Sequence, residues 1–176
     1  MRVQTLFAMT TLGLITFALI GGPATAAPAR VTYAVTADVV RGAQEPVGVV
    51  CATTTVFKRG EEVVWRARVL DTATGEDPGS VGRTPAAIEE RGLRVVAYLE
   101  NGQNFPMRYG QHPGRPQPGD YSTWFWATGW KIPADFPTGR IKWWIVVQDR
   151  TGATVRFDPI GVGMNVPAPY LTIEAR

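Results

Sequence analysis

The stretch that decides the fold class lies at residues 62–70 and reads Glu62-Val63-Val64-Trp65-Arg66-Ala67-Arg68-Val69-Leu70. Successive side chains of an extended chain point to opposite faces, so the apolar residues at every second position from Val63 to Val69 share one face. Arg66 and Arg68 then lie on the other face, toward water. This division is typical of an antiparallel sheet that packs only one side on a core.

Runs with the same period of two recur on both sides of this stretch, and Gly, Pro, Asp or Asn residues separate them. Helical periodicity is almost absent. The sequence therefore predicts an all-β domain built as an antiparallel sandwich of about eight or nine strands, the first of them at an edge. The expected strands are residues 31–37, 47–57, 62–70, 93–99, 104–109, 122–130, 140–148, 153–157 and 169–174.

Turn-forming residues refine this prediction. Asn101-Gly102 is the dipeptide most typical of a tight hairpin. Pro106 lacks a backbone N–H, which places the strand that contains it at an edge or a bulge. A short helix is expected near residues 85–90 within a longer loop. Residues 110–119 are rich in Gly and Pro, so we expect a loop there, and its composition makes it the favoured functional loop.

The N-terminal residues have the pattern of a secretory signal peptide. One charge at Arg2 precedes an apolar run that ends before Gly21-Gly22-Pro23, and the small residues Ala24-Thr25-Ala26 follow. We expect cleavage after Ala26. An uncleaved membrane anchor is the alternative, but the run is shorter than the roughly 20 residues that a span needs. The mature chain, residues 27–176, is then one domain without a membrane span.

Export is the prediction that follows, into the periplasm or out of the cell. The one cysteine, Cys51, lies far from the predicted cleavage site, so a lipoprotein signal is not expected. A single thiol in an exported protein is buried, paired between chains or reactive, and burial is the commonest of the three.

The chain has 18 basic and 15 acidic residues, and loss of Arg2 lowers its net charge from +3 to about +2. That charge is too small for a dedicated nucleic-acid binder.

A family resemblance agrees with this prediction. Residues 130–139 read Trp130-Lys131-Ile132-Pro133-Ala134-Asp135-Phe136-Pro137-Thr138-Gly139, and Asp149-Arg150-Thr151-Gly152 follows the next strand. Both segments resemble the last hairpin of bacterial immunoglobulin-like or fibronectin-III-like domains. With residues 57–61 and 105–110, they make most of residues 49–173 similar to a group of exported bacterial proteins without established activity. The resemblance implies a single immunoglobulin-like antiparallel β-sandwich and an extracytoplasmic location, but no chemistry.

Residues that could carry catalysis or bind metal are few. His112 is the one histidine, which excludes a site with several histidines. A Cys51–His112 nucleophile pair lacks the local signatures of cysteine hydrolases. The better alternative is soft-metal binding, with copper as the metal and Cys51, Met107 and His112 as ligands. Four acidic residues that could serve in catalysis fall in expected turns: Asp120, Asp135, Asp149 and Asp158. Asp is favoured in turns because its side chain hydrogen-bonds to the nearby backbone, so a structural role explains all four. We therefore expect that the protein is not an enzyme and has no resident cofactor.

Aromatic residues are concentrated in two of the expected strands. Trp124, Trp126 and Trp130 would share one face, and the adjacent Trp143 and Trp144 must point opposite ways. Such residues can fill a core, or they can form an aromatic surface beside the loop at residues 110–119. The contact surface expected in the second case comprises Arg108, Tyr109, His112, Arg115, Tyr121, Trp124, Trp126 and Trp144.

The sequence thus predicts a non-enzymatic exported sandwich that acts by binding, as an accessory or partner subunit of another extracytoplasmic protein. Recognition of a carbohydrate or another small flat ligand on the same surface is the first alternative, and copper binding is the second. A partner surface should leave a contiguous apolar patch on one sheet face, whereas a sugar site should place Trp rings flat in a groove beside polar donors.

Overall fold

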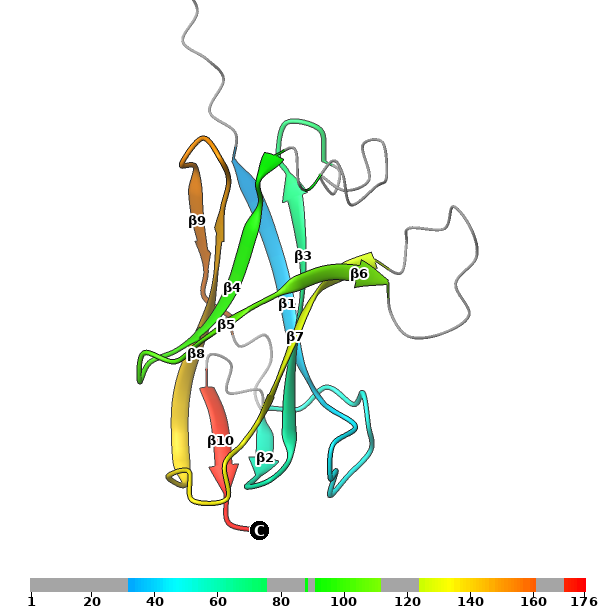
Figure 1. Ribbon diagram of the computed structural model, residues 1–176, viewed down its shortest axis with the longest axis vertical. Coiled ribbons are helices and arrows are strands. Elements are labelled where there is room, and N and C mark those ends of the chain that lie inside the picture. The colour runs from blue at the N-terminus through cyan, green and yellow to red at the C-terminus, as the bar shows by residue number, and fades with distance from the viewer. Residues whose placement is uncertain (1–31, 76–87, 89–90, 112–123, 161–169) are drawn as a thin grey trace, which may run out of the picture.

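Two β-sheets that pack face to face make up the part of the chain that the structure describes (Figure 1). It is a computed structural model, and it describes residues 32–75, 88, 91–111, 124–160 and 170–176. Ten strands occur in these residues, and the all-β sandwich that the alternating pattern predicts is confirmed. The expected signal peptide lies outside the described residues, as do most of the segment at 85–90 and residues 112–119 of the expected loop. No helix among the described residues is long and apolar enough to cross a membrane.

The first sheet has four strands in the order β1-β3-β7-β6. Their bounds are Tyr33–Arg41 for β1, Glu62–Asp71 for β3, Arg108–Gln111 for β6 and Trp124–Lys131 for β7. All neighbours are antiparallel. The first strand, β1, lies at an edge as predicted.

The second sheet has six strands, with β2-β10-β8-β4-β5 in order and β9 also paired to β8. The long central strand is β8, Gly139–Gln148, which pairs with β4 on one side and with β9 and β10 on the other. One pair, β2 with β10, is parallel, so the sandwich is not purely antiparallel. The remaining bounds are Val56–Lys58 for β2, Arg94–Leu99 for β4, Asn104–Pro106 for β5, Thr154–Phe157 for β9 and Tyr170–Glu174 for β10.

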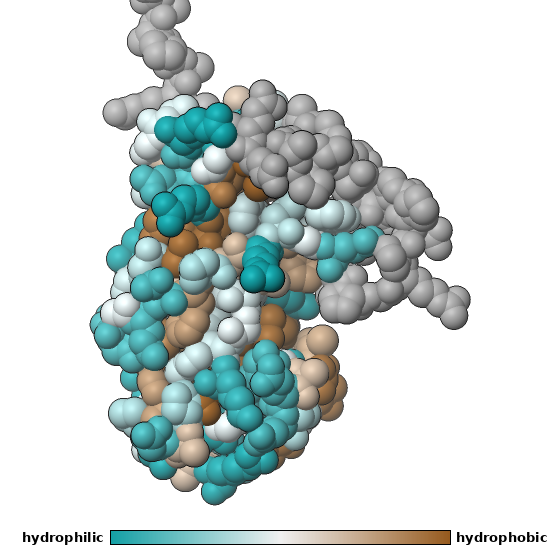
Figure 2. Space-filling view, viewed as in Figure 1, coloured by the Kyte–Doolittle hydropathy of each residue, from teal (hydrophilic) through white to brown (hydrophobic). Residues whose placement is uncertain are grey.

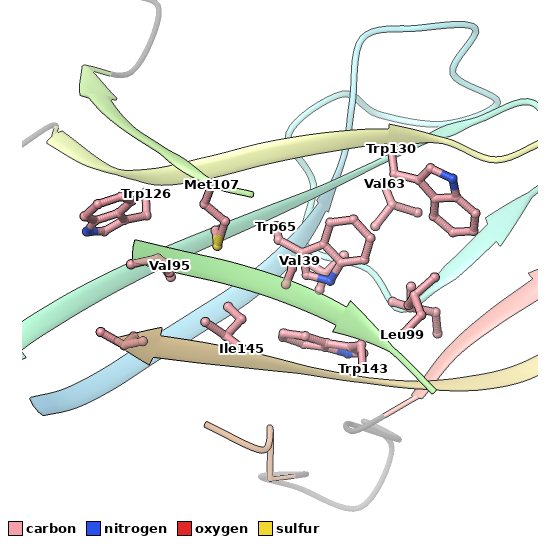
Figure 3. Packing of buried hydrophobic residues seen from close by; sticks show 14 of the residues in the cluster. Val39, Val63, Trp65, Val95, Leu99, Met107, Trp126, Trp130, Trp143 and Ile145 are labelled. Carbon is pink, nitrogen blue, oxygen red and sulfur yellow. The ribbon is translucent and has the colours of Figure 1, made fainter. Parts of the chain in front are cut away.

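Aromatic side chains from both sheets meet in the core. Trp65 of β3 is fully buried and stacks on Phe105 of β5, with ring centroids 5.0 Å apart. The ring centroid of Trp130, on β7, lies 6.3 Å from that of Trp65. Figure 3 shows Trp65 from one sheet and Trp143 from the other between the two layers. Burial of such large side chains is the main favourable contribution to folding here.

Two expected strands differ from the observed ones. Residues 104–109 are two strands: β5 belongs to one sheet and β6 to the other, and Met107 lies where the chain crosses between them. This division gives ten strands in place of eight or nine. Residues 47–57 are a strand only from Val56 onward, and the rest forms a loop with one isolated bridge, Val40 to Thr53.

The hairpin at Asn101-Gly102 is confirmed, because Leu99 N–H donates to the carbonyl of Gln103 at 2.9 Å. Pro106 lies on the edge strand β5, also as predicted.

Candidate binding surface

Exposed valines gather in one segment, residues 47–56, which we call the valine segment. Val49 is 74% exposed, and Val47, Val50 and Val56 are 39 to 50% exposed. Of the large hydrophobic residues that are exposed in the described part of the chain, only Ile160 lies elsewhere. Figure 2 shows brown atoms at the lower right, where Figure 1 places the loop that follows β1. Scattered exposed valines need no explanation, but a group of this kind is typical of an interaction site.

Backbone hydrogen bonds hold this segment against the outer edge of β1. Arg41 N–H donates to the carbonyl of Ala52 at 3.1 Å, and Cys51 N–H donates back to the carbonyl of Arg41 at 2.8 Å. Thr54 N–H donates to the carbonyl of Val39 at 3.1 Å. These bonds also cover part of the edge of β1, which would otherwise expose unpaired backbone groups.

A buried carboxylate fixes the near end of the valine segment. Glu61 accepts hydrogen bonds from Val47 N–H at 2.7 Å and Lys58 N–H at 2.7 Å, and Arg41 Nε donates to it at 2.8 Å. Arg41 in turn donates from Nη2 to the carbonyl of Val56 at 3.1 Å. Glu61 and Arg41 therefore bring the two ends of the segment together, so the exposed valines are held by the fold.

The charge of Glu61 suits this role. Burial of the carboxyl raises its pKa, but the two backbone donors and the Arg41 guanidinium lower it by more, so its pKa lies below the ordinary value. Glu61 is thus ionised at neutral pH although the residue has no exposed surface. A carboxylate that accepts several hydrogen bonds in this way is stable inside a protein.

Cys51 lies in the middle of the valine segment and is exposed, so it is not in the buried state that is commonest for a single thiol. Its φ of 60° is left-handed, a conformation that costs a residue with a Cβ about 1 kcal/mol or more. The backbone bond to Arg41 holds it there. The other proposed sulfur ligand, Met107, is buried in the core where the chain crosses from β5 to β6, and its N–H donates to the carbonyl of Val95 in β4 of the second sheet at 2.8 Å.

The proposed copper ligands are therefore not brought together as far as the structure describes them. Cys51 lies beside β1 and Met107 beside β6, with three strand spacings of roughly 4.8 Å between those strands. Metal–sulfur bonds are only about 2.3 Å long, so a separation of about 14 Å between these strands argues against one ion bound by both side chains. His112 lies outside the described residues. Among the described residues, no three His, Cys, Asp or Glu side chains are grouped to hold a metal.

The predicted aromatic contact surface is split between the core and two different sheets. Trp126 is only 4% exposed and belongs to the core, so its inclusion in a contact surface was wrong. Tyr109 lies between Trp124 and Trp126, with ring centroids 5.5 and 5.4 Å away. Tyr109 and Trp124 are half-buried, and Arg108 beside them is exposed. His112, Arg115 and Tyr121 lie outside the described residues.

Trp144 is separate from that cluster, because it lies on the outer face of the second sheet. Its ring is stacked on Tyr98 of β4 with centroids 5.9 Å apart, and the Arg156 guanidinium lies 4.3 Å from the ring centre. Neighbours on the same sheet thus cover both faces of this indole. It offers no flat platform to a sugar.

Two open grooves on the described surface have no Trp in their lining. The first, of about 360 Å³, lies on the outer face of the first sheet beside Phe125, Thr36 and the ion pair of Asp38 with Arg66. Arg66 Nε donates to Asp38 Oδ1 at 2.8 Å, and this bond raises the pKa of Arg66. The second groove, of about 610 Å³, lies beside Glu45, Lys131 and Arg176, which form two surface ion pairs.

Sequence reasoning missed the valine segment because its valines were assigned to a strand. Pro46 and Gly48 were the contrary signal, since both are more typical of a loop than of a strand interior. Comparison with known proteins adds no assignment: no family model matches the chain, and no curated protein is significantly similar to it.

Proposed function

We propose that the protein is a non-enzymatic, exported β-sandwich that binds another extracytoplasmic protein through the valine segment. The observation that carries this proposal is the gathering of four exposed valines in a segment anchored by Glu61 and β1. A preorganised apolar surface loses little conformational entropy when a partner covers it. Three of the four valines lie in a loop at the sandwich edge, and only Val56, at the start of β2, lies on a sheet face, where we expected the patch.

The strand order supports an immunoglobulin-like assignment for this sandwich. Immunoglobulin domains of the variable type place strands A, B, E and D in one sheet and strands G, F, C and C′ in the other. The orders β1-β3-β7-β6 and β10-β8-β4-β5 correspond to these when β4 is strand C and β8 is strand F. Sandwiches of this kind are common in extracytoplasmic proteins, and the N-terminal pattern of residues 1–26 supports export.

Binding of a carbohydrate or another flat ligand has less support. The half-buried Tyr109 and Trp124 are the observation in its favour, since they adjoin each other at the end of the core. The two grooves described above, however, lack a Trp, and Trp144 is covered on both faces. Copper binding has less support still, because Cys51 is exposed beside β1, whereas Met107 is buried in the core where the chain crosses from β5 to β6.

The experiment is a pull-down from an extracytoplasmic extract of the native host with the mature protein, residues 27–176, and two variants. Val49→Ser/Val50→Ser removes apolar surface without adding charge. Ile160→Ser is the matched control, because Ile160 is an exposed hydrophobic residue outside the valine segment. We expect a stoichiometric protein partner whose affinity falls at least about tenfold with the double variant and is unchanged with the control.

Two results would contradict the proposal. One is a partner that binds the double variant as tightly as the wild type, and the other is an eluate with bound copper or a small molecule but no protein. Thermal unfolding of each variant checks that the fold is intact, since substitutions at exposed positions usually change stability by less than about 0.5 kcal/mol.

A further inference from the structure

Two cations converge on one aromatic ring on the outer face of the second sheet. The guanidinium carbon of Arg140 lies 4.2 Å from the ring centre of Tyr170, and Lys142 Nζ lies 5.6 Å from it. Both cations are on β8 and both are exposed, while Tyr170 is on the adjacent β10 and is half-buried. The ring thus holds two long side chains in place, and attraction between cation and ring offsets part of their mutual repulsion.

This arrangement leaves hydrogen-bond donors available. A guanidinium that stacks by its face keeps its N–H groups at the edge, where they can bind a carboxylate in a bidentate manner. A second stacked arginine shows the difference: Arg156 lies over Trp144, but Asp158 accepts both of its donated bonds, at 2.6 and 2.8 Å. Within the described residues, Arg140 and Lys142 take part in no ion pair.

The cation pair borders the valine segment. In the sheet register, Val56 of β2 lies opposite Thr172 of β10, and Thr172 lies opposite Arg140 of β8. Neighbouring strands are about 4.8 Å apart, so Val56 and Arg140 lie roughly 10 Å apart on the same face. An apolar centre with a charged rim that contains Arg and Tyr is typical of a protein interface.

The acids on this part of the face leave one positive charge in excess. The Glu100 carboxylate accepts the backbone N–H of Lys142 at 3.0 Å, and Glu174 lies opposite Lys58 on β2. Arg140, Lys142 and Lys58 therefore outnumber Glu100 and Glu174 around Tyr170. A bound surface of opposite charge would satisfy this excess.

We infer that the partner of the valine segment is an acidic protein, which places carboxylates against Arg140 and Lys142 while its apolar side chains cover the valines. This inference rests on the proposed function. An acidic polysaccharide has the same anionic chemistry, but it has no apolar side chains to bury the neighbouring valines. The observations therefore favour a protein.

The test measures binding of fluorescent poly-L-glutamate by anisotropy at about 0.15 M salt, where charges more than about 8 Å apart are largely screened. Unlabelled polygalacturonate, an acidic polysaccharide, and an unlabelled random copolymer of L-glutamate and L-leucine serve as competitors. The variant Arg140→Glu/Lys142→Glu removes the cation pair. Arg94→Glu/Arg156→Glu is the matched control, because it makes the same change in charge on the same sheet face. Arg94 lies at the end of β4 that is far from the cation pair, and Arg156 lies on β9.

We expect wild type and control to bind poly-L-glutamate alike and the Arg140→Glu/Lys142→Glu variant to bind at least about tenfold more weakly. Polygalacturonate should compete less well, per carboxylate, than the copolymer, because only the copolymer has apolar side chains that can also cover the valines. The inference is overturned if wild type does not bind, if the control loses as much affinity, or if polygalacturonate competes better. Val49→Ser/Val50→Ser should still bind poly-L-glutamate, so loss of partner capture by that variant reports on the valine segment alone.

Discussion

Glu61 accepts the backbone N–H of Val47 at 2.7 Å, and this bond joins two points 14 positions apart in the chain. The carboxylate has no exposed surface and is also bound by Arg41 and by Lys58 N–H. One side chain thus links the turn after β2 to the start of the valine segment. The proposed interface depends on this link, because without it the exposed valines would have no fixed arrangement.

Replacement of Glu61 by Gln should destabilise the protein by about 2 to 4 kcal/mol, because a buried charge partner of Arg41 is lost and an amide N–H₂ group would face other donors. Equilibrium unfolding in urea measures the change. Glu174→Gln is the control, since Glu174 is exposed, and it should change stability by less than about 0.5 kcal/mol. Equal effects of the two substitutions would contradict the structural role of Glu61.

The stability of the wild type should also fall in acid because of Glu61. Its pKa in the folded state lies below the ordinary value of 4.5, so its contribution is fully present above that value. It is lost as the pH falls through the folded pKa. Urea unfolding between pH 3 and pH 7 should therefore show a loss of stability at the acid end that is smaller in Glu61→Gln. An identical pH dependence of the two proteins would show that Glu61 does not contribute.

Trp65→Ala should cost about 3 to 5 kcal/mol, because the ring is fully buried and stacks between the two sheets on Phe105. Its indole N–H has no acceptor among the described residues, so the loss is one of packing. Thermal or urea unfolding measures it. An unchanged melting temperature would mean that this face of β3 does not face the core.

Cys51→Ser should change stability by less than about 0.5 kcal/mol, because the thiol is exposed. Cys51→Gly should be neutral or stabilising, since Gly adopts a φ of 60° without the steric cost that a Cβ brings. The native thiol should also react with a disulfide reagent without denaturant. A thiol that reacts only after unfolding would place Cys51 in the interior.

The alternating pattern predicted much of the core. The assignment of Val63, Trp65, Ala67 and Val69 to one buried face is confirmed, as is the opposite orientation of Trp143 and Trp144. Both predictions depend only on the period of two along a strand, which is a local property of the chain.

The surface could not be predicted in the same way, because it depends on contacts between distant segments. Trp126 and Trp144 were expected on one surface, but the corner at residues 132–138 carries the chain from the first sheet to the second. The two side chains therefore lie on different sheets, and the alternation along each strand points Trp126 into the core and Trp144 away from it. The loop conformation of residues 47–55 likewise depends on Glu61 and on the edge of β1, which no local pattern reveals.

Tyr33→Phe should destabilise the protein by about 1 to 2 kcal/mol, because the Tyr33 hydroxyl donates at 2.8 Å to the buried carboxylate of Asp149. Asp149 keeps its bonds from Thr151 and from Ala153 N–H, so the corner after β8 should still form. Burial of the Tyr33 phenol, followed by its bond to Asp149, raises its pKa from 10.0 to about 12. The stability that Tyr33 contributes is then present below pH 10 and lost as the pH rises toward 12. Ultraviolet titration should show one tyrosine that ionises later than the rest and is absent from Tyr33→Phe, and a titration without such a late step would contradict the buried pair.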